Sequence, residues 1–483
     1  MSRSISSGFA WKLMERFGVQ GIQFVLQIIL ARLLDPEHYG VLSLMVIFTT
    51  LANVFIQTGF NTALIQNKDV DEDDYSSVFW ITLLIAGGLY GVLFFSAPLI
   101  AAFYDMPSII VPFRVLSLML FPGALQSVQL AKVSKEMNFR KVFFSNIGAI
   151  VISGVGGIVL AYQGAGIWAL VAQTLLNVSI ASLVMWFTVK WHPRLICNFK
   201  RVKILFTFGW KLLVSGLIET LYQDLRSLVI GKKYNSDMLG YYNRGKQFPQ
   251  FFINAVNGTV QSVMLPAMSQ KQDEQAQLKT MMRNSITLSA YVLFPMMAGL
   301  AGVAAPLVSL LLTDKWLPCV PFLQIYCFSF AFYPVHSCNL QAINAVGRSD
   351  MFLKLELIKK SYGVLALVIA VFCFQSPIAI AMTGLITSVI SCFVNAFPNK
   401  KLIGYSYFEQ MRDILPSLLL SGVMLVGIWA VSLLSLGNLV MLMLQIAVGV
   451  VIYVVLSAVL KIKPFMMILS MLTSFLKKRK GVA

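Results

Sequence analysis

Polar side chains recur at helical spacing inside an apolar stretch near the start of the chain, at residues 9–40. They are Lys12, Arg16, Gln20, Gln23 and Gln27. Residues three or four apart stack on one face of an α-helix, so the five side chains form a single stripe. A lipid-facing helix would not carry such a stripe, because an unpaired polar group in hydrocarbon is costly. The spacing predicts a membrane helix with one face toward a polar cavity.

The same text returns half a chain later, where FAWKL at 9–13 becomes FGWKL at 208–212. The polar face of this second copy consists of Lys211, Ser215, Glu219, Tyr222 and Arg226. The next apolar stretch adds Arg244, Gln247, Gln250, Asn254, Asn257 and Gln261. Asn53 and Gln57 match Asn257 and Gln261 in the second copy. We interpret the chain as two copies of one membrane unit that enclose a polar cavity.

The residue types on these faces indicate the chemistry of a cargo. A cationic face in a low-dielectric cavity attracts anions, and arginine binds phosphate oxygens through two parallel hydrogen bonds. Asparagine and glutamine suit sugar hydroxyls, which need neutral donors and acceptors. The faces therefore fit a cargo with phosphate and sugar parts.

Each residue also has a structural interpretation, and the sequence leaves both open. The amides serve equally well as contacts between helices, and Lys12 and Arg16 lie near a span end, where they can snorkel. Glu219, Asp224 and Arg226 lie well inside a span, which favours function. His336 has either a packing role or a pH-responsive one.

Catalytic and cofactor motifs are absent from the sequence. It has no Walker A sequence, GxSxG elbow or HExxH, and its three histidines have no clustered partners. The six cysteines lie mostly in apolar runs without CxxC pairing. We therefore expect no enzymatic activity, no metal and no cofactor.

Composition indicates a polytopic all-α membrane protein. The chain has 483 residues, of which 58% are hydrophobic and 12% charged, with a mean hydropathy of +0.78. We expect about fourteen transmembrane helices, near 10–34, 40–60, 77–104, 110–131, 142–163, 166–189, 205–231, 240–264, 284–312, 318–344, 355–375, 377–397, 414–435 and 438–460. They would form a six-helix lobe at 1–200, a parallel six-helix repeat at 201–400, and a further helix pair with a basic tail at 401–483.

The basic residues fall in alternate loops, which accounts for the net charge of +18 without nucleic acid as a partner. This alternation predicts that both termini are cytoplasmic. One loop, at residues 68–74, is acidic instead. Its carboxylates either complement the positive end of the helix that follows or contact a cation or partner.

Longer stretches carry a family resemblance over roughly residues 5–400. The matching text is LDPEHYG at 34–40, ALIQ at 63–66, GIWALVAQ at 166–173, HPRL at 192–195, LPAMSQ at 265–270, FPMMAGL at 294–300 and KWLPCVPFLQI at 315–325. On these residues the chain resembles the Wzx-type polysaccharide exporters, and within them the colanic-acid exporter branch. Their superfamily also holds multidrug–cation antiporters and the lipid-linked peptidoglycan precursor flippase.

The resemblance implies a flippase of the bacterial inner membrane that translocates undecaprenyl-pyrophosphate-linked oligosaccharide. Two lobes would rock around a central cavity, driven by a cation gradient, with membrane lipids, a polymerase and chain-length components as partners. Similar exporters often carry an acidic residue where this chain has Arg226, so Glu219, Asp224 and His336 are the candidates for ion coupling. A multidrug–cation antiporter, with an acidic aromatic cavity, and a polymerase or transferase component, with a long outer loop, are the competing hypotheses.

Overall fold

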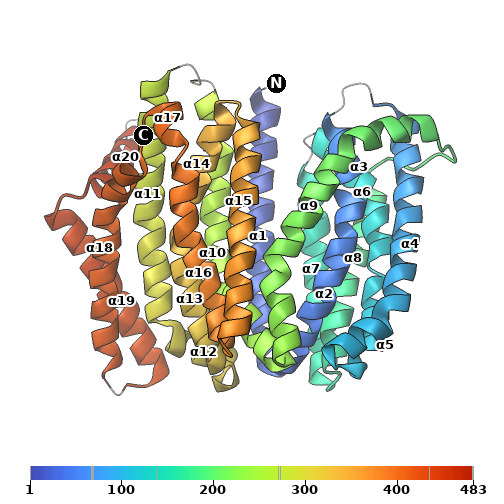
Figure 1. The fold of residues 1–483 in the computed structure, drawn as a ribbon, viewed down its shortest axis with the longest axis horizontal. Coiled ribbons are helices and arrows are strands. Elements are labelled where there is room, and N and C mark those ends of the chain that lie inside the picture. Colours follow the sequence, from blue (N-terminus) through green and yellow to red (C-terminus); the bar gives the residue numbers. More distant parts are fainter. Residues whose placement is uncertain are drawn as a thin grey trace. The chain divides into compact units, whose positions relative to one another are not determined.

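A computed structural model describes residues 2–66, 70–136, 139–269, 271, 274–434 and 436–480. Side chains are not described at 2–17, 59, 208, 255–263, 265–267, 269, 349, 471–472 and 474–480. Every regular element in the described part of the chain is a helix (Figure 1). The predicted all-α architecture is confirmed.

The first compact unit spans Met1–Asn243. Its helices are α1 (Ser2–Leu33), α2 (Pro36–Gln57), α3 (Gly59–Gln66), α4 (Glu72–Tyr104), the 3₁₀ turn η1 (Pro107–Ile109), α5 (Ile110–Ser117), α6 (Leu120–Lys135), α7 (Phe139–Tyr162), α8 (Ile167–Thr188) and α9 (Phe199–Lys233). The beginning of α10 (Ser236–Ser269) completes it.

The second unit spans Arg244–Ala483 and begins within α10. Its other elements are α11 (Gln275–Gly302), α12 (Ala304–Leu312), the 3₁₀ turn η2 (Asp314–Cys319), α13 (Val320–Ala331), α14 (Tyr333–Ala345), α15 (Ser349–Cys373), α16 (Pro377–Ala396), α17 (Asn399–Ile403), α18 (Tyr407–Ser432), α19 (Asn438–Val459) and α20 (Lys463–Lys480). The predicted lobe boundaries at 200 and 400 stay predictions.

Within the described residues, ten helical stretches are long and apolar enough to cross a membrane. Four of them are built from consecutive helices, at Pro36–Gln66, Pro107–Lys135, Asp314–Ala345 and Pro377–Ile403. The number is eleven if α9 is counted as one span, although its limbs Phe199–Thr207 and Gly209–Lys233 meet at 54°. The predicted spans on α1, α10 and α15 lie on helices outside this set, so the count of fourteen stays a prediction.

Two glycines that the internal repeat relates to each other meet in the first unit. Gly40 at the start of α2 faces Gly240 at the start of α10, and each faces backbone of the opposite helix. A Cβ added to Gly40 would overlap the carbonyl oxygen of Ser236, and one added to Gly240 would overlap that of Pro36. Glycine is required because helix backbones approach this closely only where no side chain intervenes.

Candidate functional site

The charged face of α9 runs along its second limb. Lys211 is exposed, whereas Glu219, Asp224 and Arg226 are half-buried and each makes polar contacts. The Glu219 carboxylate accepts a hydrogen bond from Gln223 Nε2 at 2.8 Å. A charged group this far inside an apolar helix needs such partners to offset its lost hydration. The structure therefore places the strongest predicted residues of the first unit on one helix.

The glutamine stripe of α1 lies on a helix that packs against α7, where Leu26 fills the space beside Gly154. Gln20 and Gln27 are half-buried and Gln23 is exposed. The side chains of Lys12 and Arg16 lie outside the described residues.

Asn53 and Gln57 on α2 contact each other. Gln57 Nε2 donates to Asn53 Oδ1 at 3.4 Å, and a Cβ added to Gly123 of α6 would lie 3.4 Å from the same oxygen. Asn53 thus sits at the packing surface between α2 and α6. The assignment of this pair to a polar cavity stays a prediction.

Arg244 on α10 is buried in the second unit. Its Nη1 donates to Gln247 Oε1 at 2.7 Å, and its guanidinium lies 5.2 Å from the ring centroid of the buried Trp316 on η2. An aromatic face and an amide oxygen are the contacts that a desolvated guanidinium favours. Asn254 is half-buried, while the side chains of Asn257 and Gln261 lie outside the described residues.

His336 on α14 has its polar neighbours on α16. Its Nε2 lies 3.1 Å from Ser388 Oγ and its Nδ1 lies 3.4 Å from Asn395 Nδ2. The Ser388 hydroxyl donates to the carbonyl of Ser329 at 2.8 Å, so its lone pairs can accept the Nε2 proton. This arrangement suits a neutral imidazole that joins α13, α14 and α16.

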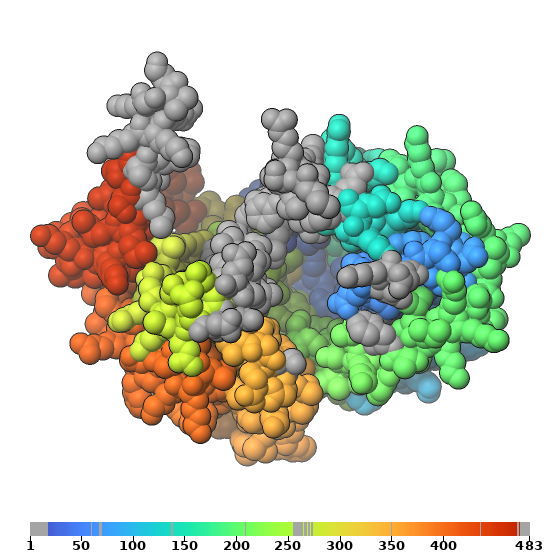
Figure 2. Space-filling model, turned by 90° about the horizontal axis from the view of Figure 1, so that it is seen from above, coloured from blue at the N-terminus to red at the C-terminus, as the bar shows by residue number. Residues whose placement is uncertain are grey.

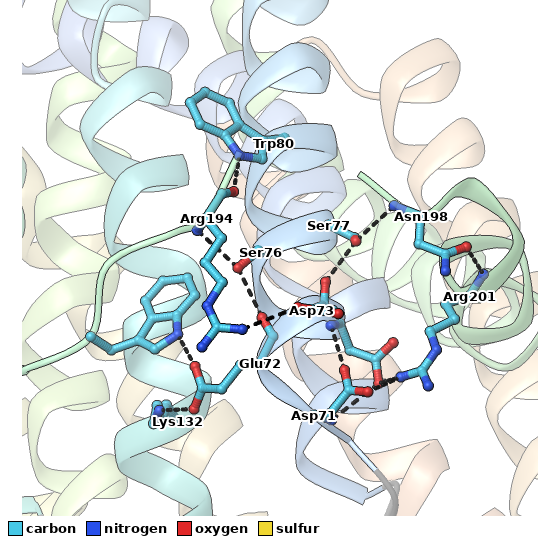
Figure 3. A network of polar contacts seen from close by, with 12 residues as sticks. Asp71, Glu72, Asp73, Ser76, Ser77, Trp80, Lys132, Arg194, Asn198 and Arg201 are labelled. Atoms are coloured by element: carbon cyan, nitrogen blue, oxygen red, sulfur yellow. Dashed lines mark hydrogen bonds and ion pairs between the residues drawn. The ribbon is translucent and has the colours of Figure 1, made fainter. Parts of the chain in front are cut away.

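An ionic cluster at the start of α4 links this helix to α9 (Figure 3). The Arg201 guanidinium bridges Asp71 and the buried Asp74, at 3.0 Å from the latter. The Asp71 side chain caps α4 by accepting from the backbone N–H of Asp74. That hydrogen bond, with the Arg201 guanidinium, holds the pKa of the Asp71 carboxyl below its usual value.

The same cluster fixes the connector between α8 and α9. Glu72 accepts from Trp191 Nε1 at 2.5 Å and from Lys132 Nζ at 2.7 Å. Ser76 Oγ accepts from the backbone N–H of Arg194 at 3.0 Å, and Ser77 Oγ accepts from that of Asn198 at 2.9 Å (Figure 3). Asp71 therefore caps α4, which is the first of the two interpretations that the sequence left open, and residues 71–74 contact other parts of the chain. Residues 68 and 69 of the acidic loop lie outside the described residues.

A counterpart in the second unit joins α11 to α18. Lys279 pairs with Glu409 at 2.9 Å, and Arg283 pairs with Asp413 at 2.5 Å. Both pairs span 130 residues, as does the pair of Arg201 with Asp71. The charges are reversed, because α4 carries acids where α11 carries bases. These pairs were not predicted from the sequence, because nothing local to either partner signals a contact at this separation.

Among the described residues, no three His, Cys, Asp or Glu side chains gather into a group that could hold a metal ion.

Comparisons with known proteins place these features in context. A family model described as "Polysaccharide biosynthesis protein" matches residues 29–321. The teichuronic acid biosynthesis protein TuaB of Bacillus subtilis is 25% identical, over 73% of both chains. The succinoglycan biosynthesis transport protein ExoT of Rhizobium meliloti is 24% identical, over 86% of this chain and 82% of ExoT. The lipopolysaccharide biosynthesis protein WzxC of Escherichia coli is 24% identical, over 87% of this chain and 88% of WzxC.

Solved structures share the fold. The lipid II flippase MurJ in an inward closed conformation superposes with a TM-score of 0.73 at 15% identity, over 94% of this chain and 98% of MurJ. A multidrug resistance transporter of the MATE family, in an inward-facing conformation, superposes with a TM-score of 0.60 at 16% identity. The match covers 81% of this chain and 98% of the transporter.

Proposed function

We propose that this chain, which belongs to the polysaccharide biosynthesis protein family, flips lipid-linked oligosaccharide across a bacterial inner membrane. The cargo would be an undecaprenyl-pyrophosphate-linked repeat unit for surface or exopolysaccharide synthesis. The resemblance to Wzx-type exporters is confirmed by the family match and by relatives named for polysaccharide biosynthesis and transport. The observation that carries the proposal is a charged, half-buried helix face, that of α9, in a member of this family with a transporter fold.

The physical case rests on the cost of moving a pyrophosphate through hydrocarbon. An unpaired charge in the membrane core is prohibitive, so a flippase must offer compensating cations along the path. We assign this role to Lys12, Arg16, Lys211, Arg226 and Arg244.

Neutral donors and acceptors would contact the sugars. We assign this role to Gln20, Gln23, Gln27, Asn254, Asn257 and Gln261. Asn53 and Gln57, which hydrogen-bond each other along α2, belong to the same proposed pathway.

Coupling to a cation gradient is the second part of the proposal. Glu219 and Asp224 are half-buried carboxylates on the same helix as Arg226, so occupancy by a cation would change the local charge beside the proposed anion path. His336 is the candidate in the second unit.

The proposal also includes topology and partners. Both termini would be cytoplasmic, and the lobes at 1–200 and 201–400 would alternate access. A polymerase and chain-length components would receive the product.

The test is complementation in a strain whose own flippase gene for the same cargo is deleted. Arg226→Gln and Arg244→Gln, each at normal protein level, should lower surface polysaccharide and accumulate the lipid-linked unit inside. Arg348→Gln is the matched control, because this exposed arginine pairs with Asp350 two residues away. Full polysaccharide in both pathway variants would contradict the proposed cation path.

A multidrug–cation antiporter is the second candidate, favoured by the likeness to a multidrug transporter of the MATE family. It predicts drug resistance in a sensitive host that depends on Glu219 and Asp224. Resistance conferred by the wild-type chain without any complementation would decide for this alternative.

A further inference from the structure

The connector and first limb of α9, residues 190–207, carry charges of one sign. Its basic residues are Lys190, Arg194, Lys200, Arg201 and Lys203, and it contains neither Asp nor Glu. We call this segment the basic platform. In Figure 1 its helical part runs above the upper end of α4. Figure 2 views the molecule from above and shows green atoms from this part of the chain at the surface.

The platform divides its cations between two faces. Arg194 and Arg201 turn toward the acids of α4, where they form ion pairs with Asp73, Asp71 and Asp74. Lys200 and Lys203 are exposed, and within the described residues neither of them has an ion pair. The ion pairs with α4 therefore use Arg194 and Arg201 and leave the charges of Lys200 and Lys203 exposed.

Large apolar side chains lie beside these lysines. Leu195 is 91% exposed, Phe199 72% and Ile204 68%. Exposed apolar groups interleaved with lysines are the pattern of an element that lies in a membrane interface, with its apolar side chains below the headgroups.

The surface is held in shape before any ligand arrives. Trp80 Nε1 donates to the carbonyl of Arg194 at 2.8 Å, and the buried Trp191 anchors the connector through Glu72. The limb leaves the direction of the second limb of α9 by 54°, so it does not continue the membrane-crossing axis. A fixed limb that turns aside where α8 ends and α9 begins is suited to the plane of the headgroups.

We propose that the basic platform binds the headgroups of anionic phospholipids, such as phosphatidylglycerol, at the membrane surface. Lys200 and Lys203 contact the phosphates, while Leu195, Phe199 and Ile204 insert among the first acyl carbons. An acidic protein segment would match the charge but would leave three exposed apolar side chains uncovered. This inference does not depend on the cargo that the chain transports.

The test uses the purified full-length chain in detergent with a polarity-sensitive dye on Cys197, which is exposed within the platform. Cys373, the other exposed cysteine, is changed to serine in every variant. Dioctanoyl-phosphatidylglycerol should give a saturable emission change that dioctanoyl-phosphatidylcholine does not. Glycerol phosphate should not compete, because it lacks the chains that the apolar residues require.

The double variant Lys200→Gln with Lys203→Gln should weaken phosphatidylglycerol binding about tenfold or more, from the typical contribution of each basic residue at an anionic surface. Lys200→Arg with Lys203→Arg should restore it. Lys400→Gln with Lys401→Gln is the matched control, because it removes the same charge from two exposed lysines of α17.

Four outcomes would overturn the proposal. Equal responses to the anionic and zwitterionic lipid would show that charge is not recognised. An equal loss in the control pair would show a general effect of net charge. Competition by glycerol phosphate at the same concentration would assign the site to free phosphate, and retained binding in the glutamine pair would remove the two lysines from it.

Discussion

Removal of Arg283 tests how much the ionic cluster of the second unit contributes to stability. The Asp413 carboxylate accepts from Arg283 Nη2 at 2.5 Å and from the Tyr405 hydroxyl at 2.7 Å. The side chain of Asp413 is only 9% exposed, whereas that of Arg283 is 48% exposed. In Arg283→Gln the carboxylate stays buried with one hydrogen bond and no countercharge.

The expected cost lies between two known limits. Exposed ion pairs contribute about 0.2–1 kcal/mol, and loss of one partner from a fully buried pair costs about 3–5 kcal/mol. Since one partner is buried and the other half-exposed, we expect Arg283→Gln to cost about 1.5–2 kcal/mol. For a unit of this size that corresponds to a fall in melting temperature of about 3–8 °C.

The assay is thermal unfolding in detergent, followed by tryptophan fluorescence. Lys279→Gln is the matched control on the same helix, because both members of its pair with Glu409 are substantially exposed; it should cost less than about 1 kcal/mol. In a double-mutant cycle, Asp413→Asn should recover part of the loss caused by Arg283→Gln. Equal melting temperatures for the two single variants would refute the assignment of the buried carboxylate as the source of the cost.

Three further predictions concern the first unit. Gly40→Ala should lower the melting temperature and the folded yield because its Cβ overlaps backbone, whereas Gly21→Ala, which has open space on α1, should leave both unchanged in the same thermal assay. The free energy of unfolding should be flat from about pH 5 to 8 and fall below about pH 4. The reason is that the pKa of Asp71 is lowered in the folded state, so this carboxylate stabilises the fold only while it is ionised. Asp71→Asn should reduce the loss of stability at acid pH, measured by thermal unfolding at a series of pH values. Trp191→Phe should cost about 1–2 kcal/mol by removing a hydrogen bond to the Glu72 carboxylate, and unchanged thermal stability would show that the connector is not held there.

The sequence predicted the features of the fold that depend on local pattern. Apolar runs of bilayer length marked most of the spans, and the FAWKL and FGWKL copies marked the repeat, because both signals lie within one helix. Breaks within spans were not predicted. The spans at Pro107–Lys135 and Asp314–Ala345 are each divided among shorter helices, which hydropathy alone does not distinguish from a continuous helix.

The candidate site was predicted as a set of helix faces, and the structure tests faces only where side chains are described. It places charged residues together along α9 and gives the buried Arg244 its contact with Trp316. Asn53 and Gln57 hydrogen-bond each other along α2, and their place in the pathway stays a prediction. Helical spacing identifies which residues share a face, but what the face contacts depends on how distant helices pack.

The two ionic clusters show why the repeat is only partly visible in the sequence. Comparison of residue types finds the repeat where the copies kept the same residue, as at Gly40 and Gly240. It fails at the start of α4 and α11, because one copy carries aspartates where the other carries Lys279 and Arg283. An ion pair is unchanged in kind when both partners exchange charge, since the Coulomb attraction depends only on the product of the charges. The three ion pairs share a separation of 130 residues between their partners, and a comparison of residue identities does not reveal this.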